Sequence, residues 1–451
     1  MLLAAGCGDG RADRELAAAI DAQLEPHVQR GDLSGAVVAG RGDRVAYARG
    51  FHLADAENRI PFTPETPAPV GALAETLTAA AVWLLAGEGR LELDAPVQRY
   101  LPRFPWPEPT LRQLLSRAAG LPDREALAAE LRPGEEWSGA RVVELLRRGG
   151  FEPRHAPGAA LAGGGLGHDL LAHVVEEVEG RSFAAFVQER LLDRLGIEVL
   201  GRGAGVPPRA LGYRREGAWL KPDPLPASAE LHGGGGLYLS ALDLFRWCSS
   251  FYADPGLREE TLERGSRPAT IGGRPAAMDQ LGWTAAAGGR RYRAARLRGH
   301  TTFAYRDDRR RHAVVFVSNT SMPIGLQPRL ERALVRVLEG GPAEAIAVPE
   351  RAPLEPGDLA AAAGAYALPV LGRLELGVIG PDELEARVGD GPRYRVRPAG
   401  EGRLHVSGLD AWLAFSAPGD GSFGRVHWTS VFSVAEGERV AAPEEPQEEV
   451  P

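Results

Sequence analysis

The composition and the pattern of apolar residues change near residue 340, and this change limits what the chain can fold into. Residues 341–357 are rich in Pro, Ala and Glu, a composition typical of a linker between domains. Before this segment, helix-like runs lie between strand-like runs, and after it short alternating strands follow one another. A chain of 451 residues is long enough for two or three domains of about 100–200 residues each. We therefore predict at least two separately folded parts.

The segment 16–340 carries strand-like runs at both ends and helical patterns between them. The strand-like runs lie at 36–40, 44–50, 291–299 and 311–318. Apolar residues at helical spacing, with Gly or Pro as stop signals, predict helices at 13–30, 72–88, 110–123, 139–149, 166–180, 183–195, 241–252 and 329–339. This layout predicts an α+β fold in which helices flank an antiparallel sheet.

The last part of the chain has a different pattern. Residues 358–440 contain short runs of alternating polar and apolar residues separated by turn residues, for example 373–376, 383–388 and 412–415. Many short strands at regular spacing predict a small barrel or sandwich. The tail 441–451 is acidic and rich in proline, and we predict that it is disordered.

Charge and residue usage exclude several classes of function. The formal net charge is −8, and the acidic residues are mixed with arginines, so no surface for nucleic acid is predicted. No run of about 18 apolar residues occurs, so no transmembrane span is predicted. The ten histidines are scattered and include no His-x-x-x-His pair. We predict neither a metal site nor a bound cofactor.

The N-terminal segment 1–15 contains the run Leu-Ala-Ala-Gly-Cys ending at Cys7, which resembles the lipobox at which bacterial lipoproteins are cleaved and lipidated. One hypothesis is a truncated lipoprotein signal, with a lipid anchor on Cys7 and a location in the cell envelope or periplasm. Six residues are too few for a signal peptide, so this hypothesis places the true start codon further upstream. The alternative is a disordered N-terminus with a chance cysteine, in a cytoplasmic protein if that N-terminus is unprocessed.

Short motifs along the chain occur in the order seen in one family of serine hydrolases. They span residues 47–51, 70–79, 90–97, 114–123, 157–158, 234–238, 281–283 and 299–300. On these motifs, the segment 16–340 resembles the family of class C β-lactamases, D-alanyl-D-alanine peptidases and serine esterases. The segment 358–440 resembles the lipocalin-like β-barrel that is often appended to such hydrolases.

The resemblance places the catalytic Ser-x-x-Lys motif of that family on Ala72 and Glu75. Alanine has no oxygen that could attack a substrate, and glutamate carries the opposite charge to the lysine. The chain has a single lysine, Lys221, and the residue three positions before it is Ala218, so no Ser-x-x-Lys exists elsewhere. Arginine cannot replace the lysine because its pKa lies above about 12. Ser–Lys chemistry is therefore excluded.

The two other catalytic motifs of the family are also altered. The Tyr-x-Asn motif falls on Gly163 and Gly165, which offer neither a proton carrier nor a side-chain amide. The Lys/His-x-Gly strand falls on His300 and Thr302. Glycine in that strand lets a substrate backbone approach, and a β-branched threonine should narrow this edge of the pocket.

Four polar residues near these motifs each have a structural and a functional interpretation. Glu75 either pairs with one of the many arginines or contacts a ligand. His168 and Asp169 begin a predicted helix, where a cap or surface role is favoured over catalysis. For His300, a structural role within the fold of the family is favoured over a catalytic role.

The leading hypothesis is a catalytically inactive homologue of a β-lactamase-type serine hydrolase, acting as a binding or scaffolding protein of the bacterial cell envelope. Its ligand would be a small molecule or a peptidoglycan-like fragment. The rival hypothesis is an esterase or peptidase with relocated machinery, using Glu75 with His300, or Thr76. Thr76 follows the pocket position on its helix and is expected to point elsewhere, which weakens that version.

Overall fold

A computed structural model describes residues 10–29 and 33–441 except 133–134, 162–164, 199–208, 217–218, 226–232, 235, 254–259, 321, 323–325, 343–357, 369–371, 381–382, 390, 392, 399–402, 407–410, 416–423 and 431–433. Cys7, Gly163, most of the predicted linker and nearly all of the predicted tail lie outside these residues. The chain divides into two compact units. The first comprises Met1–Asp21, Val28–Ser321 and Val335–Pro342, and the second comprises the remaining residues.

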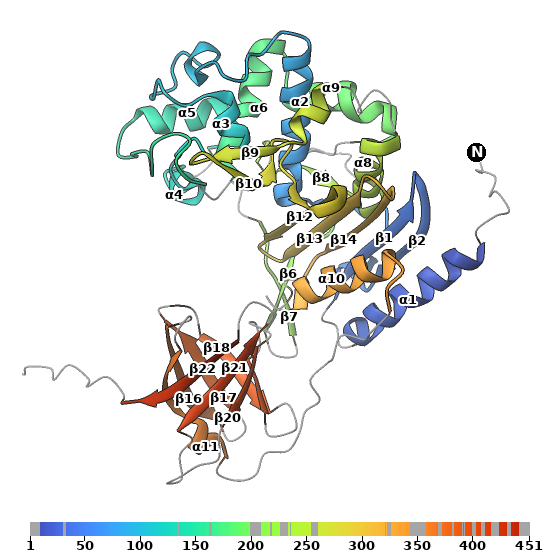
Figure 1. Ribbon diagram of the computed structural model, residues 1–451, viewed down its shortest axis with the longest axis vertical. Coiled ribbons are helices and arrows are strands. Elements are labelled where there is room, and N and C mark those ends of the chain that lie inside the picture. Colours follow the sequence, from blue (N-terminus) through green and yellow to red (C-terminus); the bar gives the residue numbers. More distant parts are fainter. Residues whose placement is uncertain are drawn as a thin grey trace, which may run out of the picture. The chain divides into compact units, whose positions relative to one another are not determined.

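The first unit is built on an eight-stranded antiparallel sheet in the order β2-β1-β14-β13-β12-β11-β10-β9 (Figure 1). The strands are β1 (Gly35–Arg41), β2 (Arg44–Phe51), β9 (Pro268–Ile271), β10 (Arg274–Asp279), β11 (Thr284–Ala286), β12 (Arg290–Leu297), β13 (His300–Asp307) and β14 (His312–Ser318). β1 pairs with β14 from Gly35↔Ser318 to Arg41↔His312, so strands from the two ends of the predicted segment lie side by side near the β2 edge of the sheet. All eight residues of β13 are buried, which is typical of a central strand covered on both faces.

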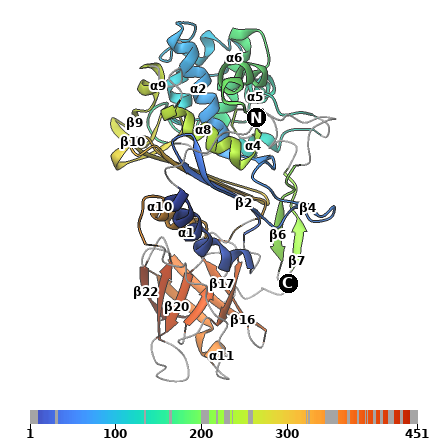
Figure 2. The same cartoon turned by 90° about the vertical axis from the view of Figure 1, so that its right-hand side faces the viewer.

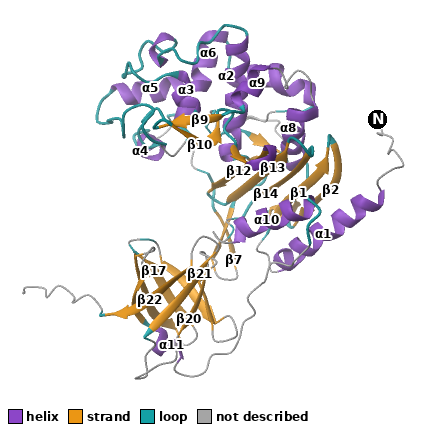
Figure 3. Ribbon diagram, viewed as in Figure 1, coloured by secondary structure: helices purple, strands orange, loops and turns teal. Residues whose placement is uncertain are grey.

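Helices accompany this sheet. In the described residues the helices of the chain are α1 (Gly10–Gln29), α2 (Ala74–Gly87), α3 (Leu111–Leu115), α4 (Arg124–Ala128), α5 (Gly139–Arg147), α6 (Leu166–Glu179), α7 (Phe183–Val187), α8 (Ala241–Ala253), α9 (Glu260–Gly265), α10 (Leu326–Leu338) and, in the second unit, α11 (Asp358–Ala362). α8 packs on β1, β13 and β14, and Figure 3 shows it against the face of the sheet. The predicted α+β fold with an antiparallel sheet and helices is confirmed. None of the described helices is long and apolar enough to span a membrane.

The central helix α2 is buried along most of its length. It packs against α6 and α9, and Figures 1 and 2 both show it within the group of helices. Its sequence is dominated by Ala and Leu, which are strong helix formers and fit a helix with no solvent face. A 3-10 turn, Gly71–Leu73, precedes it. Any residue at the start of α2 is therefore held rigidly by the surrounding core.

Three short two-stranded sheets complete the first unit in the described residues. They pair β3 (Leu53–Asp55) with β4 (Ile60–Pro61), β5 (Ala68–Pro69) with β8 (Tyr238–Leu239), and β6 (Tyr213–Glu216) with β7 (Trp219–Pro222). The β5–β8 pair continues into a hydrogen bond from the Val70 amide to the Leu237 carbonyl. This pairing fixes the chain immediately before α2.

The second unit contains a closed barrel of eight antiparallel strands in sequential order. They are β15 (Gly364–Leu368), β16 (Gly372–Gly380), β17 (Glu383–Val388), β18 (Arg393–Pro398), β19 (Arg403–Val406), β20 (Ala411–Phe415), β21 (Arg425–Ser430) and β22 (Val434–Val440). The barrel closes because β15 pairs with both β16 and β22. Apolar side chains form one packed core, which includes Tyr366, Leu384 and Trp428. Partly exposed ion pairs such as Glu383–Arg397 link neighbouring strands.

Candidate functional site

The candidate site lies at the start of α2, where the sequence analysis places the altered Ser-x-x-Lys motif. Ala72 is in the 3-10 turn before the helix and is partly exposed. Its carbonyl oxygen accepts a hydrogen bond of 3.2 Å from Nε of Arg293 on β12. The side chain at this position is a methyl group, so it cannot form a covalent bond to a substrate.

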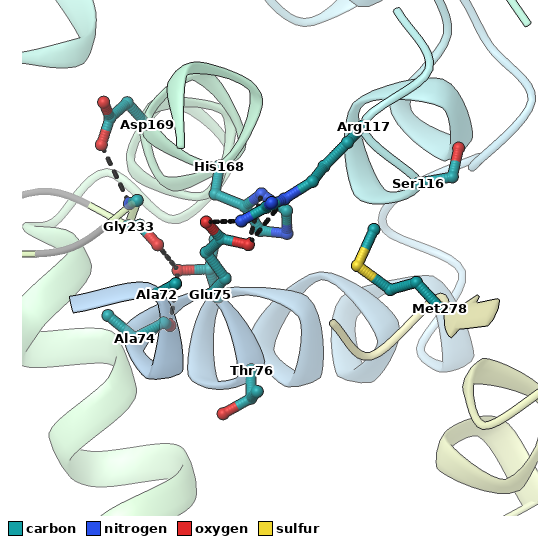
Figure 4. Close-up of polar contacts among 12 residues, drawn as sticks. Ala72, Ala74, Glu75, Thr76, Ser116, Arg117, His168, Asp169, Gly233 and Met278 are labelled. Carbon is teal, nitrogen blue, oxygen red and sulfur yellow. Dashed lines mark hydrogen bonds and ion pairs between the residues drawn. The ribbon is translucent and has the colours of Figure 1, made fainter. Parts of the chain in front are cut away.

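Glu75 lies one turn further along α2 and is 1% exposed. Its carboxylate accepts a hydrogen bond of 2.6 Å from Nη2 of Arg293. Arg117, just after α3, donates two more hydrogen bonds to it, one of 3.0 Å from Nε and one from Nη2 (Figure 4). The structure therefore shows the arginine pairing that the sequence analysis weighs for Glu75. We name Glu75, Arg117, Arg293 and the adjacent His168 the ion cluster.

Arg117 adopts a left-handed backbone conformation, with φ of 57°. A residue other than glycine is uncommon there, and such residues persist where the surrounding structure requires them. The side chain of Arg117 is 19% exposed, whereas that of Arg293 is 8% exposed. Arg117 is therefore the more accessible of the two cations.

The electrostatics of the ion cluster keep Glu75 ionised. Burial disfavours the carboxylate, but His168 in its protonated form, Arg293 and Arg117 favour it more strongly and lower the pKa of Glu75 below its usual range. One carboxylate and two guanidinium groups leave a net charge of +1 when His168 is neutral. A carboxylate with a lowered pKa accepts a proton only weakly near neutral pH.

His168 lies in the first turn of α6 and is fully buried. Its Nδ1 is 3.7 Å from Oε2 of Glu75, which is too long for a hydrogen bond. Burial lowers the pKa of His168 to about 4, although Glu75 opposes this shift, so the ring is neutral near pH 7. Neither ring nitrogen has a hydrogen-bond partner among the described residues.

Asp169, the next residue, connects α6 to three other segments of the chain. Its Oδ2 accepts hydrogen bonds of 2.8 Å from Nε of Arg124 and 3.0 Å from Nε1 of Trp137, and its Oδ1 accepts one of 2.9 Å from the Gly234 amide. Asp169 is fully buried. The cap or surface role predicted for His168 and Asp169 is therefore wrong, because both side chains lie in the interior of the unit.

The position of the missing Asn is filled by backbone from another segment. A Cβ atom added to Gly165 would lie 2.5 Å from the Gly234 carbonyl oxygen and 2.8 Å from its Cα. Atoms do not approach that closely without a shift of the backbone. Gly165 is therefore required by packing, whereas Gly163, at the Tyr position, lies outside the described residues.

His300 and Thr302 lie on β13, and both are buried. Thr302 pairs with Ala295 of β12 and Val317 of β14, and its hydroxyl is 3.4 Å from the Pro69 carbonyl oxygen. Burial alone lowers the pKa of His300 to about 3. Among the described contacts of Glu75, none involves His300, so the structure does not bring these two residues together as a catalytic pair.

Thr76 points away from the ion cluster, as the sequence analysis expects. Its hydroxyl donates a hydrogen bond of 2.7 Å to the Leu73 carbonyl and accepts one of 2.9 Å from Nε1 of Trp247. Figure 4 shows its side chain on the opposite side of α2 from Glu75. Both hydrogen bonds hold it in the core of the unit.

Ala72 and Glu75 follow from the sequence motifs, whereas the partners of Glu75 do not. Arg117 lies within the motif at 114–123. Its place in that motif, together with a glutamate at the position of the lysine, is a signal from which this ion pair could have been predicted. Arg293 lies 218 residues from Glu75, and no sequence pattern distinguishes it from the other arginines. No group of three or more His, Cys, Asp or Glu residues in the described part of the chain could hold a metal ion.

Comparisons with known proteins agree with the fold. A family model described as Beta-lactamase matches residues 17–339. The chain is 25% identical to the penicillin-binding protein PbpX of Bacillus subtilis (strain 168) over 218 residues, which are 48% of this chain and only 54% of PbpX. It is 30% identical to Esterase EstB of Burkholderia gladioli over 298 residues, which are 56% of this chain and 74% of EstB.

A solved structure resembles the chain along most of its length. The octameric penicillin-binding protein homologue from Pyrococcus abyssi has a TM-score of 0.62 and 20% sequence identity. The match covers 94% of this chain and 99% of that chain. At this identity, the likeness concerns the fold.

Proposed function

Because the chain belongs to the Beta-lactamase family, we propose that it is a catalytically inactive member that acts as a binding or scaffolding protein. The observation that carries this proposal is the ion cluster. Glu75 is held between Arg117 and Arg293 at the position of the catalytic lysine, next to a residue without a nucleophilic atom. Serine hydrolases of this kind require both an attacking oxygen and a neighbouring base.

The altered residues remove complementary parts of the chemistry. Ala72 removes the nucleophile, and the lowered pKa of Glu75 removes a proton acceptor that works near neutral pH. The contact of Gly165 with Gly234 leaves no room for a side-chain amide. In catalytic units of this type, loss of the nucleophile alone removes nearly all of the rate advantage.

The rival proposal of relocated machinery has less support. Thr76 accepts a hydrogen bond from Trp247 on the side of α2 opposite Glu75. His300 is buried on β13 and has no contact with Glu75 among the described residues. Neither residue is placed to act with Glu75 on one substrate atom. An esterase or peptidase activity would need residues other than those that the sequence suggests.

The charge of the ion cluster indicates what the site could bind. Its net charge of +1 and the partial exposure of Arg117 favour a ligand that offers a carboxylate. A small carboxylic acid or a peptidoglycan-like peptide fragment has this group. We propose that ligand class for the site at Ala72, with Arg117 as its contact.

The barrel of the second unit is proposed to be lipocalin-like. Eight antiparallel strands in sequential order, closed between the first and the last, are the arrangement of up-and-down barrels such as lipocalins. The apolar core that fills this barrel favours a structural module over a carrier of a small ligand.

The location in the cell envelope rests on the lipobox-like residues that end at Cys7. A matched pair tests it in a bacterial host. The full-length chain with its natural upstream sequence should incorporate an alkyne-labelled fatty acid, and the Cys7→Ala variant should not. Absence of label from both proteins would contradict lipid anchoring.

The absence of catalysis is tested by covalent labelling of the intact protein. A fluorophosphonate probe and a fluorescent penicillin should form no adduct detectable by intact-mass spectrometry, whereas an active serine penicillin-binding protein treated in parallel should be labelled. A broad ester and peptide screen should show no turnover above buffer. An adduct that maps to one residue, or saturable turnover that is lost on mutation of one residue, would overturn the proposal.

A further inference from the structure

A cavity lies at the other end of α2, separate from the ion cluster. Its volume is about 540 Å³, which is within the range of small-molecule sites. It is lined by Trp83, Ala86, Gly87, Leu91, Leu93, Arg112, Arg264, Arg267 and Gln280. Trp83 lies eight residues after Glu75 on α2, which corresponds to about 12 Å along the helix axis. The two sites therefore do not share a lining residue.

Hydrogen bonds connect the elements that line this cavity. Gln280 accepts a hydrogen bond of 3.3 Å from Nε1 of Trp83 at its backbone carbonyl and one of 2.7 Å from Nη1 of Arg112 at its side chain. Its amide donates a hydrogen bond of 2.9 Å to the Gly265 carbonyl. One residue thus joins α2, α3 and the end of α9. These hydrogen bonds hold the lining elements in fixed positions, so the cavity is part of the folded structure.

The charge of the lining is unusual for this protein. Three of its residues are arginines and none is acidic, whereas the whole chain carries a net charge of −8. Arg112 is oriented by two hydrogen bonds of 2.6 and 2.8 Å to Asp94, which is not itself a lining residue. Arg264 and Arg267 are exposed at the cavity. Arginines that line one cavity suit carboxylate or phosphate oxygens.

The remaining lining residues supply an apolar wall. Trp83 presents its ring at the cavity and Arg112 lies over that ring, with Cζ 5.9 Å from the ring centroid. Leu91 and Leu93 add aliphatic surface next to it. A ligand that reaches both the arginines and this wall needs an anionic group attached to an apolar body.

We propose that this cavity binds a small organic anion, with a carboxylate or phosphate held by the arginines and a flat apolar group against Trp83, Leu91 and Leu93. The site is independent of the proposed loss of catalysis at Ala72. Its occupant would contact α2, α3 and the chain after α9 at once, and would therefore stabilise the first unit by binding only its folded form.

Three probes test the proposal on the full-length protein: benzoate, phenyl phosphate and inorganic phosphate, each followed by isothermal titration calorimetry and by the shift of the thermal unfolding midpoint. Concentrations up to about 10 mM reach sites of millimolar affinity. Benzoate or phenyl phosphate should bind saturably with one site per chain, and inorganic phosphate should bind at least about tenfold more weakly because it lacks the apolar body. The stronger of the two organic probes identifies the anionic group.

Matched variants locate the binding. Arg267→Gln removes one exposed guanidinium from the cavity and should weaken the organic anion about tenfold, the effect of losing one hydrogen bond to a charged group. Arg147→Gln changes an equally exposed arginine on α5 that does not line the cavity, and its affinity should equal that of the wild type. The unfolding midpoints of both variants without ligand establish that they fold.

Three results would overturn the proposal. They are no saturable binding of either organic anion, an affinity that Arg267→Gln leaves unchanged, and an affinity for inorganic phosphate equal to that for the organic anions.

Discussion

At the residue scale, the two arginines around Glu75 determine how much folding stability is lost when its carboxylate alone is removed. Arg293 is nearly buried, and its guanidinium has Glu75 as its charged partner in the described contacts. A buried cation that loses its partner keeps its desolvation penalty and gains repulsion from the second cation. The ion cluster is thus a unit whose members depend on one another.

Glu75→Gln is expected to lower the free energy of unfolding by about 3–5 kcal/mol, as for other broken buried ion pairs. The control is Glu65→Gln, an exposed carboxylate in the same unit, which should change it by no more than about 0.5 kcal/mol. Urea unfolding followed by circular dichroism measures both. Equal stabilities for the two variants would show that the arginines do not depend on Glu75.

Two buried histidines with a lowered pKa, His168 and His300, predict how stability depends on pH. The pKa of His300 is lowered to about 3 in the folded protein, from about 6.5 in an unfolded chain. Between those values the unfolded state binds a proton that the folded state does not, so stability falls as the pH falls below about 6.5. Each such histidine contributes a slope that approaches about 1.4 kcal/mol per pH unit.

His300→Gln is therefore expected to flatten the loss of stability between about pH 6.5 and pH 5 by up to this amount, leaving the contribution of His168. Urea unfolding curves at several pH values in this window measure the slope. A slope identical to that of the wild type would mean that His300 takes up its proton in the folded protein as readily as in the unfolded chain.

At the scale of the elements, the sequence pattern predicted most helices and the strands β1, β2, β12 and β14, but not the interruptions of the helices or the contacts between elements. The predicted helix at 183–195 is α7 followed by a π turn at Gln188–Leu192 and a 3-10 turn at Asp193–Leu195. Apolar spacing does not distinguish these from a regular helix. β9 and β10 were missed because their residues include Pro and Ala and show little apolar alternation.

For the candidate site as well, local positions were predictable from the sequence and long-range contacts were not. The positions of Ala72 and Glu75 follow from local motif spacing, so the sequence suffices to find them. The partners of Glu75 and the contact between Gly165 and Gly234 depend on which segments the fold brings together. Such long-range contacts are set by packing of the whole unit and leave no local pattern.

The contact between α6 and the segment at Gly234 predicts that catalysis cannot be restored by a few substitutions. Ala72→Ser with Glu75→Lys should show no β-lactam or ester hydrolysis, because the added lysine would face Arg117 and Arg293 and no amide is present at 165. Adding Gly165→Asn should destabilise the protein further, since its Cβ would meet the Gly234 backbone at 2.5 Å. Clear turnover by either variant would show that the rest of the pocket is competent.

Gly165→Ala isolates the packing effect and should lower the free energy of unfolding by about 1–3 kcal/mol. Its control is Gly10→Ala, since a Cβ at Gly10 would have only an ordinary contact at 3.9 Å. Thermal unfolding compares the two variants. A destabilisation no larger than that of the control would mean that the two segments separate easily.

At the scale of the whole molecule, the barrel has the features of an independently folding part. Its strands close on themselves, and its core is made by residues between Leu359 and Trp428. The second unit also includes Ala22–His27, which lies in α1, and Met322–Leu334, which ends within α10. Whether the barrel needs those two segments decides where the domain boundary belongs.

A fragment of residues 358–440 is expected to unfold cooperatively on heating, followed by far-ultraviolet circular dichroism, because the barrel buries its own apolar core. The control is the same fragment with Leu384→Ala, a fully buried core residue, which should lower the midpoint or abolish the transition. A fragment that stays unfolded alone but folds when mixed with residues 1–340 would place the two parts in one domain.

The close approach of Gly165 and Gly234 also governs how this sequence can change over generations. An asparagine codon at 165 is harmful until the segment at 234 has moved, and moving that segment brings no benefit while 165 remains glycine. On the proposal that the chain has lost catalysis, each of the two changes toward a hydrolase site is disfavoured unless the other has already occurred. Descendants of this chain should then acquire new binding properties more readily than hydrolase activity.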